Sequence, residues 1–236
     1  MRNIILILPF FLGFAFMYYG GNTPTTTEVI VLRDVTDTHV AKPVREDITP
    51  LFKLDDNKWN GAVFRFTDLS DVNLNRSSEA KIKEENQWFS NEYEREESVR
   101  HFYAEIDSIL SGAEKESIGK KHTAVYIPLA EELNRLAESD ARRKVALVYS
   151  DLMENQKEMS FYDKKKILLL QDEPDEVKSF LEKEEQLGKL SGIEIYFLYQ
   201  PQDVESDKAY RIVSSFYKKL LEEKGAKVKV MANFIE

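Results

Sequence analysis

The stretch EVIVLRDVTDT, residues 28–38, contains the pattern that decides the fold. Its first half, Glu28–Leu32, is short and nearly all apolar, which is typical of a strand buried on both faces of a sheet. Its second half is polar and places Asp34, Thr36 and Thr38 at alternate positions. Alternate residues of an extended chain face the same side, so we expect one carboxylate and two hydroxyl groups to point toward one place where this strand ends.

Strand-like and helix-like segments alternate on the C-terminal side of this stretch. Strands are expected within residues 61–69, 144–151, 192–200 and 227–234, with a further one beginning at 72–75. Helices are expected within residues 92–110, 123–139, 175–187 and 206–226, with a short helix or turn at 45–54 and either a short strand or a buried helix at 166–172. This order predicts an α/β fold, a Rossmann-like three-layer αβα domain with a mostly parallel central sheet and helices on both faces.

One internal stretch does not fit this alternation. Residues 73–97 are too polar for an interior element, and two interpretations stay open for them, a partner-facing elaboration or an exposed loop. Trp59, Trp88 and the tyrosines and phenylalanines at helical or strand spacing, including Tyr93, are expected in the core.

The N-terminal residues differ in composition from the rest of the chain. An apolar run from Ile4 to Tyr19 follows Arg2 and is interrupted only by Pro9 and Gly13. Such a run is typical of a signal peptide or a membrane anchor, and a buried N-terminal strand is the less favoured alternative. An uncleaved anchor is favoured over a cleaved signal because no pair of small residues marks a cleavage site.

We therefore divide the chain into three parts. They are a signal peptide or membrane anchor at 1–19, a Gly- and Thr-rich tether at 20–27 and an α/β domain at 28–236. This division predicts a domain that is membrane-anchored or exported, at a periplasmic or other extracytoplasmic face.

The composition excludes several classes of function. The formal net charge is −9, and lysine and arginine are interleaved with aspartate and glutamate, so nucleic acid is not expected as a partner. The chain has no cysteine, which excludes disulfides, thiolate metal sites and cysteine nucleophiles. The histidines do not have the spacing of metal ligands; they are His39, His101 and His122.

A second set of polar residues follows another buried strand. Ser150 and Asp151 end the segment 144–151, and in a parallel sheet they lie at the same edge as Asp34 if the two strands are neighbours. Two carboxylates brought together repel each other, and a hard divalent cation removes that repulsion. Mg²⁺ takes oxygen ligands at roughly 2.0–2.1 Å and keeps several waters, so a site of few carboxylates and several hydroxyls favours it over Ca²⁺, with Mn²⁺ as an alternative.

This pattern resembles the metal-ion-dependent adhesion site (MIDAS) of the von Willebrand factor A (VWA) domain. That family places Asp-x-Ser-x-Ser after the first strand, a threonine before a later helix and an aspartate after the fourth strand. Here threonine replaces both serines, and the matching residues are Asp34, Thr36, Thr38, Thr123 and Asp151. The resemblance covers residues 28–236, the whole of the predicted α/β domain.

The resemblance implies a protein-binding module and not an enzyme. In the family, the cation completes its coordination with an acidic residue of a partner protein, and no reaction follows. This chain departs from the family pattern beside two of the matching residues, because His122 precedes Thr123 and Leu152 follows Asp151 where glycine is usual.

Two other interpretations stay open. A haloacid-dehalogenase-like, magnesium-dependent phosphohydrolase also uses an aspartate after its first strand, but the second aspartate that such enzymes need is replaced here by Thr36. Alternatively, the aspartates and threonines are turn formers and helix caps, and the domain is a degenerate VWA-like structural subunit that binds no metal.

Overall fold

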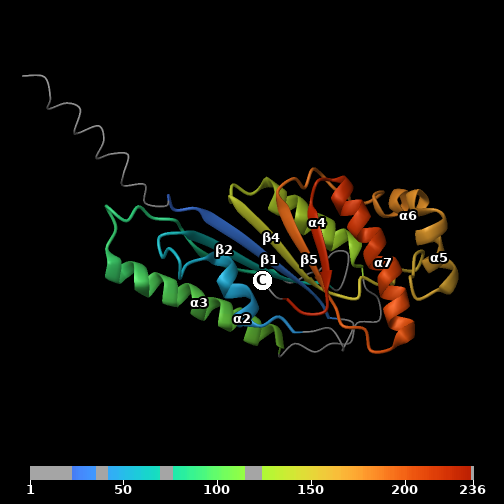
Figure 1. Cartoon of the computed structure of the whole chain (residues 1–236), viewed down its shortest axis with the longest axis horizontal. Helices are drawn as coiled ribbons and strands as arrows, with labels where there is room; N and C mark the ends of the chain where they lie inside the picture. The colour runs from blue at the N-terminus through green and yellow to red at the C-terminus, as the bar shows by residue number, and fades with distance from the viewer. Residues whose placement is uncertain (1–22, 36–41, 70–76, 115–123, 235–236) are drawn as a thin grey trace, which may run out of the picture.

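A six-stranded sheet forms the centre of the structure (Figure 1). The computed structural model describes residues 23–35, 42–69, 77–114 and 124–234. The strands are β1 (Thr26–Asp34), β2 (Gly61–Leu69), β3 (Ser77–Ile82), β4 (Arg143–Tyr149), β5 (Ile193–Leu198) and β6 (Lys227–Met231).

The strand order is β3-β2-β1-β4-β5-β6. Strand β1 pairs in parallel with both β2 and β4, and β5 pairs in parallel with β4 and β6. Only β3 is antiparallel to its neighbour, β2. The predicted Rossmann-like α/β fold with a mostly parallel sheet is therefore confirmed, and so is the predicted contact between the first strand and the strand that precedes Asp151.

Helices follow or connect the strands. They are α2 (Arg45–Ile48), the 3-10 helix η1 (Thr49–Phe52), α3 (Glu92–Glu114), α4 (Tyr126–Glu138), α5 (Lys164–Asp172), α6 (Pro174–Leu181) and α7 (Val204–Glu223). The segment 166–172, for which strand and helix were both open, is part of helix α5. None of the helices in the described ranges is both long and apolar enough to cross a bilayer; the predicted targeting segment at 1–19 lies outside those ranges.

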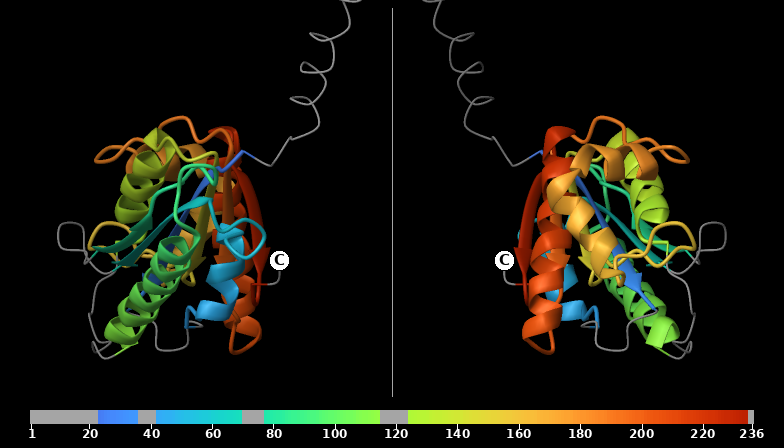
Figure 2. Two further views of the ribbon diagram at one scale, coloured as in Figure 1. Left: turned by 90° about the vertical axis from the view of Figure 1, so that its left-hand side faces the viewer. Right: turned by 90° about the vertical axis from the view of Figure 1, so that its right-hand side faces the viewer.

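Two hydrophobic cores lie on the two faces of the sheet, because successive strand residues point to opposite faces. Leu32, Val148 and Phe197 belong to the core under α4, α5, α6 and α7. Val31 and Leu147 belong to the core under α2, η1 and α3. Figure 2 shows the sheet between these two groups of helices, which completes the predicted three layers.

Two expectations from the sequence are wrong. Residues 77–82, expected in a partner-facing elaboration or an exposed loop, form the edge strand β3. The backbone of β3 pairs with β2, and only one of its faces is buried, so Ala80 and Ile82 pack into the core under α3 while the residues between them stay polar. Trp88 and Tyr93, expected in the core, are exposed; Trp88 precedes α3, and Tyr93 lies on the face of α3 opposite the core residue Phe102, nine residues away. The predicted strand start at 72–75 lies outside the described residues.

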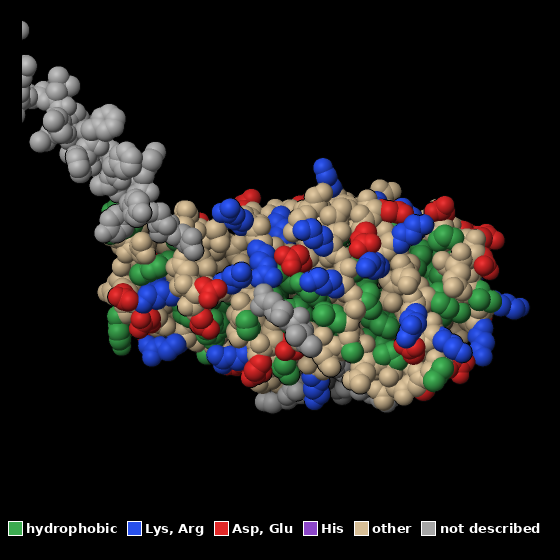
Figure 3. Space-filling model, in the orientation of Figure 1, with side chains coloured by type: hydrophobic (Ala, Val, Ile, Leu, Met, Phe, Trp, Pro, Cys, Tyr) green, Lys and Arg blue, Asp and Glu red, His purple; other side chains and the backbone are tan. Residues whose placement is uncertain are grey.

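The surface has a mixed charge pattern. On the face shown in Figure 3, lysine and arginine side chains are interspersed with aspartate and glutamate. Such mixing is typical of a solvated surface.

Candidate functional site

The carboxyl ends of β1 and β4 place the two predicted carboxylate ligands at one edge of the sheet. The last register pair of these strands is Arg33 with Tyr149, so Asp34 and Ser150 come next at the same edge of the sheet. Asp34 ends β1 with 3% of its surface exposed, and Asp151 follows β4 by two positions with 7% exposed. Residues more than a hundred positions apart in sequence thus reach one edge, as predicted.

Ser150 links the two segments directly. Its Oγ donates a hydrogen bond of 3.0 Å to Asp34 Oδ2 and accepts one of 2.8 Å from the backbone N–H of Leu152. The Ser150 hydroxyl therefore fixes the position of the Asp34 carboxylate relative to the loop that contains Asp151. In the sequence Ser150 is only the neighbour of Asp151; its place opposite Asp34 depends on the register of β1 and β4.

The three predicted hydroxyl ligands cannot be placed beside these carboxylates. Thr36, Thr38 and Thr123 all lie outside the described residues. Within the ranges that are described, no three histidine, aspartate or glutamate side chains gather closely enough to hold a metal ion by themselves. A site of the predicted kind has only two carboxylates, so it depends on the threonines.

Leu152 stands where the VWA family usually has glycine, and its backbone adopts a conformation typical of glycine. Its backbone has φ +61°, in the left-handed region that glycine adopts most readily. This conformation costs a leucine on the order of 1–2 kcal/mol, and its side chain is fully buried in the core under α4 and α7. The turn after Asp151 therefore has the backbone shape of a glycine turn, although leucine occupies it.

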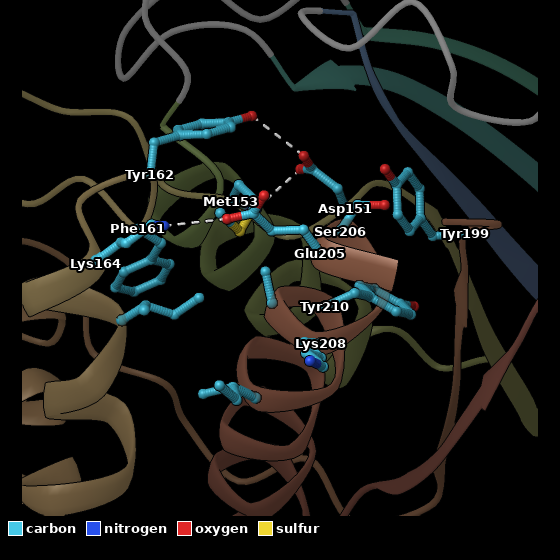
Figure 4. Close-up of a pocket in the computed structure, with 13 residues that line it drawn as sticks. Asp151, Met153, Phe161, Tyr162, Lys164, Tyr199, Glu205, Ser206, Lys208 and Tyr210 are labelled. Carbon is cyan, nitrogen blue, oxygen red and sulfur yellow. Dashed lines mark hydrogen bonds and ion pairs between the residues drawn. The ribbon is translucent and has the colours of Figure 1, made fainter. Parts of the chain in front are cut away.

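A cavity of about 630 Å³ opens beside Asp151. Figure 4 shows its residues converging from the loop after β4, from α5 and from the first turns of α7. Its walls include Phe161, Ile167 and Tyr210. At the exposed rim, Lys164 of α5 forms an ion pair of 3.2 Å with Glu205 of α7. The edge of the sheet thus combines a carboxylate pair with an adjoining, largely apolar recess.

Tyrosines surround the Asp151 carboxylate (Figure 4). Tyr162 Oη donates a hydrogen bond of 3.2 Å to Asp151 Oδ2, and the Met153 N–H donates one of 2.9 Å to Oδ1. The ring of Tyr210 lies 4.9 Å from that of Tyr199, between ring centroids. Burial and, next, the nearby charge of Asp151 raise the pKa of the Tyr210 hydroxyl well above its usual value, so Tyr210 stays neutral.

Glu154, in the loop after Asp151, is hydrogen-bonded to the start of α4. Its side chain is fully buried, and Oε1 accepts hydrogen bonds from the backbone N–H groups of Val125 and Tyr126 and from Tyr217 Oη. Oε2 accepts a further bond from Gln156 Nε2. Burial raises the pKa of Glu154 to about 7 and outweighs these hydrogen bonds, which act to lower it.

This glutamate fixes the start of helix α4, because Val125 and Tyr126 are the residues where that helix begins. The segment that leads into α4 contains the predicted ligand Thr123. Glu154 thus ties the loop after Asp151 to the helix that follows Thr123.

Four residues of this region were not among the predicted site residues: Glu154, Tyr162, Tyr199 and Tyr210. For Tyr199 a usable indication existed, since it directly follows β5 at the same edge of the sheet as Asp151. Glu154 and Tyr162 lie in an irregular loop without periodicity, and nothing in the sequence indicates where their side chains point.

Comparison with known proteins adds no family assignment. No protein-family model matches this sequence, and no curated protein matches it.

Proposed function

We propose that this chain is a membrane-tethered, non-catalytic protein-binding module that depends on a divalent cation. Asp34 and Asp151 hold Mg²⁺, with Mn²⁺ or Ca²⁺ as substitutes. The hydroxyl ligands come from Thr36, Thr38 and Thr123, as the resemblance to the VWA adhesion site implies. An acidic residue of a partner protein completes the coordination.

One observation carries this proposal: two buried aspartates from distant parts of the sequence follow the ends of neighbouring strands, and Ser150, next to Asp151, is hydrogen-bonded to Asp34. In a doubly wound sheet of order 3-2-1-4-5-6, ligands bind where the strand order reverses, which is between strands one and four. Asp34 and Asp151 follow β1 and β4, so they lie at that point.

The donor set fits a hard cation. Asp34 and Asp151 both supply carboxylate oxygens, and both side chains are nearly excluded from water. Like charges repel more strongly in such a low-dielectric environment than in water, so a bound cation offsets a larger repulsion there. The glycine-like turn at Leu152 is also consistent with the loop shape of the adhesion-site family. The two buried carboxylates are what supports a metal-binding domain over a degenerate VWA-like subunit.

The cavity beside Asp151 indicates what else the partner supplies. Phe161, Ile167 and Tyr210 line a recess that suits an apolar side chain. We therefore expect the partner segment to place a bulky apolar residue next to its acidic one.

Calorimetric titration with MgCl₂ or MnCl₂ tests the metal site. The wild-type protein is expected to release or absorb heat on binding, and to gain about 2.7 kcal/mol of stability at a cation concentration 100 times the dissociation constant. Asp34→Ala and Asp151→Ala are each expected to lose both effects because each removes one of the two carboxylates of the proposed site. Circular dichroism of the variants without metal verifies that they fold.

Asp172→Ala is the matched control, because Asp172 is an exposed carboxylate at the end of α5. It should titrate like the wild type. Equal affinity in the wild type and in both site variants would refute the assignment of Asp34 and Asp151. A wild-type protein that shows neither heat nor a thermal shift would support the degenerate structural subunit instead.

A further inference from the structure

Three large aromatic side chains lie uncovered on the surface near the start of α3. Trp88, Phe89 and Tyr93 are 70%, 90% and 69% exposed. Single exposed apolar residues are common, but three neighbouring aromatics are unusual on a surface that faces only water. We call Trp88, Phe89 and Tyr93 the aromatic cluster.

The backbone of this cluster is held by its own hydrogen bonds. Asn86 Oδ1 accepts a bond of 2.9 Å from the Trp88 N–H, and Asn86 O accepts one of 3.0 Å from the Phe89 N–H. Asn91 Oδ1 accepts a bond of 3.0 Å from the Tyr93 N–H at the beginning of α3. The aromatic rings are thus presented by a defined turn.

Arg95 links this turn by hydrogen bonds to the edge of the sheet where β1 and β2 begin. Its side chain is 1% exposed and donates to the backbone carbonyls of Lys58, Asn60 and Lys83. Its Nη1 also lies 3.2 Å from Glu85 Oε1. One buried guanidinium therefore joins the loop before β2, the segment after β3 and the first turn of α3.

The same edge contains the start of the described chain. The Thr25 N–H donates a bond of 3.1 Å to Asn60 Oδ1, and Thr26 Oγ1 donates one of 3.0 Å to Glu84 Oε2. In Figure 2 the chain enters β1 at the end of the molecule where the connection into α3 also lies. The aromatic cluster and Thr23 therefore belong to one end of the domain.

The tether that precedes this end is short. Residues 20–22 separate Tyr19, the last residue of the predicted membrane segment, from Thr23. Four Cα–Cα steps at full extension span at most about 14 Å. A bilayer that holds the segment 4–19 must therefore lie close to the end of the domain that displays the aromatic cluster.

We propose that the aromatic cluster docks into the surface of the lipid bilayer that holds the N-terminal segment. Tryptophan and tyrosine are enriched at membrane–water interfaces because their rings are apolar and their N–H or O–H groups bond to water or headgroups. The partner is thus a bilayer surface, and this inference rests on the membrane tethering in the proposed function.

This orientation places the candidate metal site away from the membrane. Strand β1 runs from Thr26, beside the tether, to Asp34 at the site, which is about 26 Å for eight steps of roughly 3.3 Å. Docking through the aromatic cluster therefore leaves Asp34, Asp151 and the adjoining cavity open to a partner in the aqueous phase.

Fluorescence of the full chain in vesicles tests the proposal. The chain has two tryptophans, and Trp59→Phe leaves Trp88 as the only one. This variant is reconstituted in phosphatidylcholine vesicles with and without brominated acyl chains, which quench tryptophans within the bilayer. We expect Trp88 to lose most of its emission in the brominated vesicles and to emit at shorter wavelength than in denaturant.

A second variant controls for position. Trp59→Phe, Trp88→Phe and Val204→Trp together place a single tryptophan at an equally exposed residue, Val204, at the start of α7. Its emission should not respond to brominated lipid. Equal quenching at both positions would contradict the proposed orientation.

Flotation of the same vesicles separates the two ideas. If the chain floats with the vesicles while Trp88 is unquenched, the proposed docking of the aromatic cluster is refuted and the proposed membrane tether is retained. If the chain does not float, the tether and the docking surface are both wrong, although the metal titration of Asp34 and Asp151 is unaffected. Unquenched Trp88 emission that shifts with protein concentration would assign the cluster to a second copy of the chain, against the proposal.

Discussion

Replacing Glu154 with glutamine is expected to remove a fall in stability that the wild-type protein undergoes as pH rises. The pKa of Glu154 is about 7 in the folded protein, against 4.5 for an unperturbed glutamate. The folded state therefore binds this proton more tightly than the unfolded state does. Stability from this group is fully present below pH 4.5 and is lost as pH rises to about 7. The loss is about 3 kcal/mol, from about 1.4 kcal/mol for each unit of difference.

Glutamine preserves most of the hydrogen bonds while removing the titration. Its Oε1 can still accept from Val125, Tyr126 and Tyr217, and only the bond from Gln156 to the second oxygen is lost. As pH rises from 4.5 to about 7, the wild type should lose about 3 kcal/mol of unfolding free energy that Glu154→Gln does not lose. Urea denaturation of both proteins across the range measures the difference.

An exposed glutamate in the same loop provides the control. Glu158→Gln removes a carboxylate that faces solvent, and its stability curve should run parallel to that of the wild type. Parallel curves for Glu154→Gln as well would contradict the raised pKa of Glu154. Glu154→Ala, in contrast, leaves the N–H groups of Val125 and Tyr126 unpaired and is expected to cost about 1–3 kcal/mol for each buried group at any pH.

The central strands could be predicted from the sequence because their burial appears directly in their composition. Residues 28–32 and 144–149 are buried between two layers of helices, so almost every side chain is apolar. Their adjacency followed from the strand order that such alternating chains adopt. Strand β3 could not be predicted in the same way, because an edge strand with one solvated face needs only Ala80 and Ile82 to be apolar.

The candidate site was predictable only where it coincides with strand ends. Asp34 directly ends β1 and Asp151 follows β4 by two positions, so the geometry of a parallel sheet brings them to one edge. Glu154 and Tyr162 come from the loop after β4, where a single left-handed residue, Leu152, redirects the chain. No local pattern encodes that turn, because leucine rarely adopts this conformation.

The exposed aromatic cluster shows the opposite limit. Tyr93 precedes Phe102 by nine residues, about two and a half turns, so the two side chains lie on opposite faces of α3. Arg95, seven residues before Phe102, lies on the buried face in the first turn and is 1% exposed. Approximate spacing of aromatic residues therefore overstates the core, because an offset of half a turn places a side chain in solvent.

Methionine in place of Arg65 is expected to lower the free energy of unfolding by about 3–5 kcal/mol. Arg65 of β2 is buried and forms an ion pair with Glu28 of β1, and its Nη2 lies 3.3 Å from Glu132 Oε2 of α4. Removing the guanidinium leaves Glu28 buried without its counter-charge. Chemical denaturation at neutral pH measures the loss.

Two comparisons show whether the loss comes from the buried charge. Lys178→Met breaks a partly exposed ion pair with Glu223, of 2.9 Å, and should cost less than about 1 kcal/mol. Combining Arg65→Met with Glu28→Met removes the two most deeply buried of these three charges. Glu132 keeps Arg135 at 3.9 Å as a counter-charge, so most of the stability should return. A single Arg65 variant no less stable than Lys178→Met would mean that water already solvates the pair.

The double variant also separates the stability of the domain from its candidate site. Glu28 precedes Asp34 by six positions on β1, which places it about 20 Å from the carboxyl edge of the sheet. If the cation is held by Asp34, Asp151 and the threonines, replacing Glu28 and Arg65 together should leave its affinity unchanged. A variant of recovered stability that no longer binds the cation would instead show that the charges between β1, β2 and α4 set the geometry of the site.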